Sequence, residues 1–230
     1  VTVTDDNGCT GTASQEITAS TAGTAISSIN NEAAMSFNGT DQYIDLGTPE
    51  TLNLTQDMSI SAWINTNTIA SGTRVIICDC NTPPSQSQFC LEINRTAGKI
   101  SALANGQEVA LIGSTTLSTD TWYHVALTRS GSTGNWNYVI YLNGVVDGSA
   151  TTSDNPSSQQ GVAIGRFGKD SSGYFSGKID EVAIWDSALS SCDVKGIHDA
   201  TTTVNGQPKS ANLLDTNTTI PAPVYWNRMG

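Results

Sequence analysis

The sequence predicts an all-β protein, an antiparallel two-sheet sandwich with one short helix near its C-terminal end. Between residue 33 and about residue 187, short apolar runs alternate with Gly, Asn, Ser and Pro, and none of them has a 3.6-residue period. Asn143-Gly144 and Asn105-Gly106 each separate two such runs, which predicts tight hairpins. With 230 residues, 37% of them hydrophobic, the chain is long enough to bury a full core.

The N-terminal segment is predicted to belong to a preceding domain. Residues 1–14 contain a strand, an Asp-Asn-Gly turn and a second strand, which is the pattern of a β-hairpin. This hairpin resembles the last one of the immunoglobulin-like PKD-type repeats in Bacteroidota-like surface proteins. Residues 15–32 are small and polar, and we expect a linker and one entry strand there. The sandwich itself is then expected to span residues 33–199.

A cysteine-bearing hairpin is predicted in the first half of the sandwich. Cys78 and Cys80 share one face of the strand 74–80, and Cys90 lies on the expected partner strand 88–94. This arrangement predicts either a Cys78–Cys90 or a Cys80–Cys90 disulfide, which requires an oxidising compartment. Since the chain has only two histidines, a zinc cluster is not expected.

The strand 179–185 is predicted to lie between two layers because its apolar residues occupy both faces. Strict alternation places Asp180 and Glu181 on opposite faces. A buried carboxylate such as Asp180 needs a partner, and a cation is the simplest one. The helix is expected within 187–199, capped by Ser187 or Ser190. Residues 200–230 are expected to be a connector and the start of a following strand.

The charge balance excludes several partners. The net charge is -11 and the pI is about 4.3, which argues against nucleic acid and anionic membranes as partners. No run of about 18 apolar residues is present, so membrane insertion is not expected. An acidic chain rich in Ser, Thr and Asn suits a secreted or cell-surface protein.

Four motifs in order resemble the laminin-G-like (concanavalin A-like) jelly roll of bacterial surface proteins. They are Ala34–Gly47, Met58–Asn65, Thr121–Arg129 with Tyr141–Val145, and Gly173–Leu189. The resemblance covers roughly residues 33–199 and implies the jelly-roll order of strands. It also implies a structural calcium ion, held by Asp180 together with the turn at Asn38, Gly39 and Asp41, since calcium takes carboxylate and carbonyl oxygens.

Domains of this kind bind sugars on one sheet or in loops at one edge. Sugar recognition requires aromatic platforms together with amide and carboxylate groups. The candidates are Trp136 with its neighbours Asn135 and Asn137, and the loop residues Phe167 and Tyr174. We therefore expect a polysaccharide or glycoprotein glycan as partner.

Catalysis is the less favoured interpretation. Glycoside hydrolases need two carboxylates facing one cleft, and none of the six glutamates has the Glu-x-Asp-x-x-Glu spacing. The sequence thus predicts a non-catalytic cell-surface adhesion module that binds glycans with calcium support. The alternative is a structural spacer or protein–protein interaction module in a large adhesin, in contact with neighbouring domains of the same chain.

Overall fold

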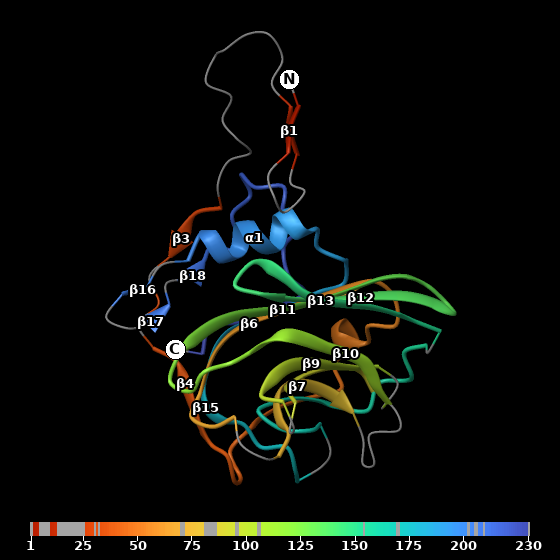
Figure 1. Ribbon diagram of the computed structural model, residues 1–230, viewed down its shortest axis with the longest axis vertical. Coiled ribbons are helices and arrows are strands. Elements are labelled where there is room, and N and C mark those ends of the chain that lie inside the picture. The colour runs from red at the N-terminus through yellow and green to blue at the C-terminus, as the bar shows by residue number, and fades with distance from the viewer. Residues whose placement is uncertain are drawn as a thin grey trace.

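The computed structural model describes most of the chain from residue 26 onward. The described residues are 2–4, 10–12, 26–29, 31, 33–69, 72–80, 87–94, 97–104, 107–153, 155–168, 171–201, 203–204, 207–208 and 210–229. Two antiparallel sheets pack face to face, and α1 (Ser191–Asp199) covers the outer side of one of them (Figure 1). The predicted all-β sandwich with one short helix is therefore confirmed.

The two sheets have six and seven strands. The six-stranded sheet has the order β10-β9-β8-β7-β14-β5, and the seven-stranded sheet has the order β13-β12-β11-β6-β15-β19, with β4 paired to β15. The strands of the first sheet are β5 (Ile44–Gly47), β7 (Arg74–Cys80), β8 (Ser87–Ile93), β9 (Lys99–Ala104), β10 (Gln107–Thr116) and β14 (Val162–Ile164). Those of the second are β4 (Met35–Asn38), β6 (Met58–Thr66), β11 (Trp122–Ser132), β12 (Asn135–Leu142), β13 (Val145–Thr152), β15 (Ser176–Trp185) and β19 (Tyr225–Asn227).

Shorter elements complete the chain. They are the pair β1 (Thr2–Thr4) and β2 (Thr10–Thr12), the pair β16 (Thr203–Val204) and β17 (Gln207–Pro208), the pair β3 (Ser28–Ile29) and β18 (Ser210–Ala211), and the 3-10 turn η1 (Glu50–Leu52). The β1–β2 ladder belongs to neither large sheet. The turn and the cysteine between β1 and β2, at residues 5–9, lie outside the described residues.

The central strands bury both faces, as the apolar pattern predicts. In β6, Ile60 and Ile64 point into the main core between the sheets, whereas Ser61 and Trp63 face the layer formed by α1 and the C-terminal segment. In β15, Trp185 belongs to a second cluster under α1. Apolar side chains dominate the inner face, so the hydrophobic effect specifies the sandwich.

The predicted alternation of β15 fails at one point. A β-bulge shifts the register between Asp180 and Ala183, and Glu181 has a φ of 52°. Because a bulge adds one residue to one strand, the side chains after it point to the face opposite to the one that strict alternation predicts. Ile179 and Val182 therefore both face the main core. The prediction that Asp180 and Glu181 point to opposite faces is wrong, because one amide contacts both carboxylates.

Several local predictions are confirmed. Asn143 and Gly144 have φ values of 50° and 77° in the turn between β12 and β13, where a left-handed conformation is required. Ser190 caps α1 in a capping box with Asp193. Of the two open disulfide pairings, the structure contains Cys78–Cys90, between directly opposed residues of β7 and β8.

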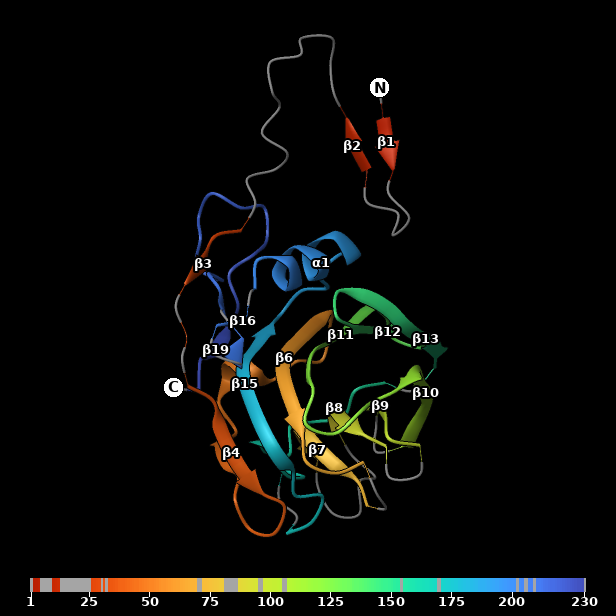
Figure 2. The same ribbon diagram turned by 60° about the vertical axis from the view of Figure 1, so that its left-hand side comes forward.

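The predicted boundaries of the sandwich change at both ends. β19 pairs with β15 and β18 pairs with β3, so the segment predicted as a C-terminal connector belongs to the domain (Figure 2). Leu213 and Met229 are buried, as is Ile26 from the predicted linker. The motif Ala34–Gly47 resembles an opening hairpin in the sequence but does not form one, because β4 and β5 join different sheets. The first and last strands of the domain are thus held by pairings between segments far apart in the chain, and local sequence patterns do not predict such pairings.

Candidate functional site

The structure does not bring the predicted calcium ligands together. Asn38 lies opposite Ser176 in the β4–β15 pair, and Asp180 is four residues further along β15. At about 3.3 Å per residue this is about 13 Å, too far for one ion. Asn38 and Asp41 instead close their own exposed turn, with the Asn38 amide donating to Asp41 Oδ1 at 2.7 Å. The turn with Gly39 is therefore corrected from a ligand set to a local Asx turn.

Asp180 belongs to a buried acidic pair at the bulge. The Nδ2 atom of Asn31 lies 3.0 Å from both carboxylate oxygens of Asp180, 2.6 Å from Glu181 Oε1 and 3.1 Å from the Arg228 carbonyl. Trp226 donates to Glu181 Oε2 at 2.7 Å. Burial and the neighbouring Glu181 raise the pKa of Asp180 to about 8. Burial likewise raises the pKa of Glu181. The pair connects the N-terminal entry, β15 and β19.

A second buried titratable group lies nearby on β11. His124 is 1% exposed, and its ring centroid is 5.5 Å from that of Trp63 and 5.8 Å from that of His198. Neither ring nitrogen has a hydrogen-bond partner among the described residues. Burial, with a smaller contribution from His198, lowers the pKa of His124 to about 3. His124 is therefore neutral at physiological pH.

The predicted aromatic platform on β12 is wrong. Trp136 is 1% exposed and belongs to the main core, where its Nε1 donates to Asn155 Oδ1 at 3.1 Å. A ring buried in this way cannot stack on a sugar. Asn135 and Asn137 are exposed on the opposite face of the strand, because side chains alternate. The ligand set predicted around Trp136 is thus divided between core and surface.

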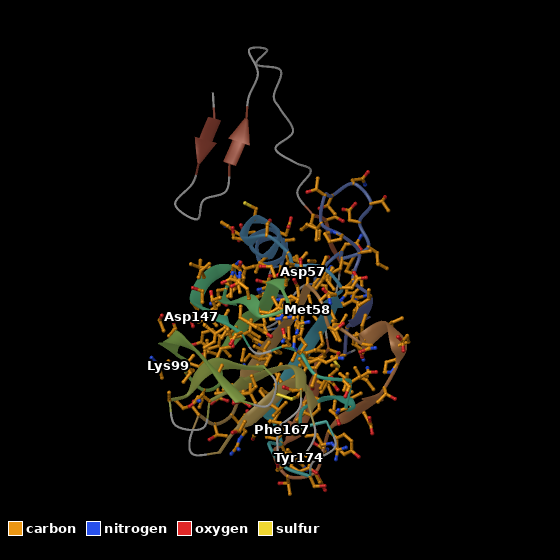
Figure 3. The ribbon with its side chains drawn as sticks, turned by 90° about the vertical axis from the view of Figure 1, so that its right-hand side faces the viewer. Asp57, Met58, Lys99, Asp147, Phe167 and Tyr174 are labelled. Atoms are coloured by element: carbon orange, nitrogen blue, oxygen red, sulfur yellow. A yellow bond between two sulfur atoms is a disulfide. The ribbon has the colours of Figure 1, made fainter. Side chains whose placement is uncertain are left out.

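The other predicted aromatic residues do lie together. Figure 3 shows Phe167 and Tyr174 side by side at one end of the sandwich, far from Asp147 and Lys99. Both are half-buried. The Tyr174 ring centroid is 6.4 Å from that of Tyr43, which is 40% exposed. Arg166 stacks on Tyr43, with its Cζ 3.4 Å from the ring centroid. We refer to Tyr43, Arg166, Phe167 and Tyr174 as the aromatic–arginine cluster.

This cluster adjoins a pocket at the β5 edge of the six-stranded sheet. The pocket has a volume of about 530 Å³, and Arg166 forms part of its lining. The other residues that line it are Asp45, Gly47, Thr48, Gly161 and Gly168. It therefore combines a carboxylate, a hydroxyl, a guanidinium and glycine backbone groups, with aromatic rings beside them.

Backbone contacts fix the loop that carries the cluster. Val75 donates to the Gly173 carbonyl at 2.9 Å, and Phe175 donates to the Gly165 carbonyl at 2.8 Å. Gly173 has a φ of 69°, and a Cβ there would approach the Phe167 ring to 2.7 Å. These contacts hold Phe167 against the described segment that carries Tyr174.

Sequence reasoning missed Tyr43, Asp45 and Arg166. A signal for the first two was present, since Tyr43-Ile-Asp-Leu46 alternates and its exposed positions are Tyr43 and Asp45. Arg166 precedes a residue that was predicted, but its approach to Tyr43 depends on the pairing of β14 with β5. Only the sheet order brings these two loops together.

Comparisons with known proteins agree with this fold. Residues 38–195 match the laminin-G-type family described as the concanavalin A-like lectin/glucanases superfamily, and the chain belongs to that family. Among curated proteins no match was found. No helix in the described part of the chain is long and apolar enough to cross a membrane.

Three solved structures illustrate the fold. The SAP-like pentraxin from Limulus polyphemus is 20% identical, with a TM-score of 0.56 over 75% of this chain and 83% of its own. The Ruminococcus gnavus IT-sialidase CBM40 bound to α2,3 sialyllactose is 16% identical, with a TM-score of 0.57 over 74% and 98%. Domain 4 of an extracellular arabinanase from Geobacillus stearothermophilus, in complex with arabinotriose, is 19% identical, with a TM-score of 0.50 over 74% and 84%.

Proposed function

We propose that this domain is a non-catalytic glycan-binding module of a secreted or cell-surface protein and that it binds sugars at the aromatic–arginine cluster. The observation that carries the proposal is the pocket of about 530 Å³ lined by Asp45, Thr48 and Arg166. Arg166 stacks on Tyr43, and Tyr174 lies beside Tyr43. Aromatic rings pack against the apolar face of a sugar, and carboxylate and hydroxyl groups bond its hydroxyls. The carbohydrate complexes named for two structural neighbours are consistent with this use of the fold.

The acidic pair does not support a catalytic function. Asp180 and Glu181 share one face, but Asp180 is fully buried and Glu181 is 6% exposed. They lie beneath Asn31 and β19, where no substrate could reach both carboxylates. A glycosidase requires its two carboxylates in an accessible cleft.

Replacing Tyr174 by alanine should weaken glycan binding about tenfold, which corresponds to about 1.4 kcal/mol of binding free energy. The stacked ring is lost, whereas the pocket remains. Tyr43→Ala should have a similar effect. The measurement is a glycan array with the 230-residue chain, followed by titration of the strongest ligand. Val146→Ala is the matched control, since Val146 is 53% exposed on β13 and its chain neighbour Asp147 lies far from Phe167 and Tyr174 in Figure 3.

Unchanged binding by both tyrosine variants would place the glycan site elsewhere. An array without any bound glycan would contradict the proposal and favour the alternative, a spacer or protein-contact module. Circular dichroism of each variant shows whether the domain remains folded.

Calcium support is part of the proposal, with a ligand set different from the predicted turn. Four oxygens surround Asn31 Nδ2, which has only two hydrogens to donate. Two carboxylates, a carbonyl and an amide oxygen are ligands that suit calcium. The described residues contain no cluster of three or more His, Cys, Asp and Glu side chains, so the carbonyl of Arg228 and the amide of Asn31 would have to contribute. A bound ion would neutralise the two adjacent carboxylates.

Millimolar calcium is therefore expected to raise the melting temperature of the wild-type domain but not that of Asp180→Asn, because ligand binding to the native state stabilises it. Differential scanning calorimetry with calcium and with chelator measures this difference. Asp41→Asn is the control, since Asp41 belongs to the turn that the structure separates from Asp180. Loss of the calcium response in Asp41→Asn alone, or its persistence in Asp180→Asn, would contradict this assignment.

Secretion or surface display is consistent with the covalent structure. Cys78 and Cys90 form a disulfide, and Cys192 on α1 is disulfide-bonded as well. Disulfides persist in oxidising compartments and are rare in the cytosol. The role in adhesion, the origin from a Bacteroidota-like bacterium and the preceding PKD-type repeat remain predictions.

A further inference from the structure

Arg166 is a nearly buried cation, and no carboxylate of the described residues pairs with it. Its side chain is flat against Tyr43, with Cζ 3.4 Å from the ring centroid, and one terminal nitrogen donates to the Gly168 carbonyl at 3.2 Å. The residue is 9% exposed, and its Nε has no hydrogen-bond partner in the part of the chain that the structure describes. The ion pairs of the described residues are Lys195–Asp199, His198–Asp199 and Arg228–Glu181. No described carboxylate therefore lies within ion-pair distance of Arg166.

A guanidinium in this position is costly without a ligand. Removing a charge from water destabilises the folded state unless an anion or several hydrogen bonds compensate for it. Arg166 has one carbonyl and one aromatic ring. The fully buried Arg129 is better satisfied, since it donates to the carbonyls of Leu54, Gln56 and Gln88. The comparison indicates that Arg166 is positioned for a group that the described residues do not supply.

The pocket beside Arg166 has the size and composition for such a group. It is about 530 Å³ in volume, and Asp45 and Thr48 line it with Arg166. The planar fork of arginine matches a carboxylate, with which it forms paired hydrogen bonds. The chain has a net charge of -11 and repels anions at a distance. Binding of an anion at this pocket therefore depends on the short-range contact with Arg166.

We infer that the glycan bound at this pocket is an acidic sugar, whose carboxylate pairs with Arg166. The inference rests on the proposed glycan-binding function and names the ligand class. The sugar ring packs against Tyr43 and Tyr174, and its hydroxyls bond Asp45 and Thr48. Because Arg166 is held flat by Tyr43, the cation is oriented before the ligand arrives, which reduces the entropic cost of binding.

The test compares an acidic glycan with its neutral derivative. Uronic-acid and sialic-acid oligosaccharides are titrated into the 230-residue chain as free acids and as methyl esters, with sulfated neutral oligosaccharides as a third set. We expect the wild type to bind one free acid at least about tenfold more tightly than its ester. Arg166→Gln should bind acid and ester equally, and Arg166→Lys should retain part of the preference, because lysine keeps the charge without the fork.

Each other outcome overturns the inference in a distinguishable way. Binding of neutral glycans that Tyr174→Ala weakens and Arg166→Gln does not would leave the proposed function intact and contradict the acidic ligand. A preference for sulfated over carboxylated sugars would exclude the carboxylate assignment. Absence of any glycan binding would overturn the proposed function as well. Thermal melting of Arg166→Gln and Arg166→Lys establishes that both variants are folded.

Discussion

Replacing Arg129 by methionine is expected to lower the free energy of unfolding by about 3 to 5 kcal/mol, because several buried acceptors lose their donor at once. Arg129 is 0% exposed and lies on β11. Its Nε donates to Gln56 O at 2.9 Å, and its two terminal nitrogens donate to Gln88 O and Leu54 O, each at 2.7 Å. Gln88 belongs to β8 of the other sheet, so this guanidinium joins the two layers.

The aromatic surroundings of Arg129 increase the effect. Its Cζ lies 5.4 Å from the ring centroid of Trp136 and 5.9 Å from that of Tyr138, and both rings are buried. The buried Trp136, which resembles a sugar platform in the sequence, is thus part of the support for this cation. Truncating Trp136 would therefore leave a cavity in the core, and we expect no direct effect on the exposed glycan site.

Urea unfolding of wild type and Arg129→Met measures the prediction. Arg129→Lys should also be destabilised, because one ammonium cannot reach three carbonyls in the same geometry. Lys99→Met is the control on a half-buried surface position of β9 and should stay within about 0.5 kcal/mol of wild type. Equal midpoints for wild type and Arg129→Met would show that the carbonyls find other donors.

Lowering the pH from 7 to 5 is expected to reduce the free energy of unfolding by about 2 kcal/mol through His124 alone. The pKa of His124 is lowered from 6.5 to about 3 in the folded state. Below pH 6.5 the unfolded chain binds a proton at this histidine and the folded chain does not. Stability from this group is therefore complete above pH 6.5, decreases as the pH falls, and reaches its minimum near pH 3.

The matched variant for this prediction is His124→Phe, which retains a ring against Trp63 and His198. Its unfolding free energy should fall less between pH 7 and pH 5 than that of the wild type. Carboxyl groups such as Glu181 titrate in both proteins, so the difference between them isolates His124. His198→Phe should retain most of the pH dependence, because burial is the larger cause of the lowered His124 pKa and His198 contributes the smaller part. Identical pH profiles for wild type and His124→Phe would contradict a buried neutral histidine.

Local patterns in the sequence were sufficient for the fold class and for several of its details. The Asn143-Gly144 turn, the cap at Ser190 and the pairing of Cys90 with Cys78 or Cys80 depend on residues close in the chain. Turn and cap preferences arise from backbone sterics and single hydrogen bonds, which act over a few residues. The proximity of Phe167 and Tyr174 was also predictable, because one short loop carries both.

The errors concern contacts between distant segments. Trp136 has polar neighbours in sequence, but the phase of β12 turns its ring into the core. One inserted residue at Glu181 reverses the alternation of β15 and brings two carboxylates together. Neither the phase of β12 nor the bulge in β15 can be recognised from the residue types nearby in the sequence. Each is decided by packing against other strands, since a shift of one residue moves a side chain to the other face.

The sequence by itself therefore determined the sandwich, its central strands and its helix, and it limited the hairpin disulfide to two pairings, because periodicity and turn chemistry are local properties. Tertiary structure alone decided that β19 and β18 close the domain, that Asp180 meets Asn31 and Glu181 instead of the turn at Asn38, and that Arg166 rests on Tyr43. These arrangements depend on sheet order and register. The burial of apolar surface by the whole chain determines sheet order and register, and a local sequence pattern does not contain that information.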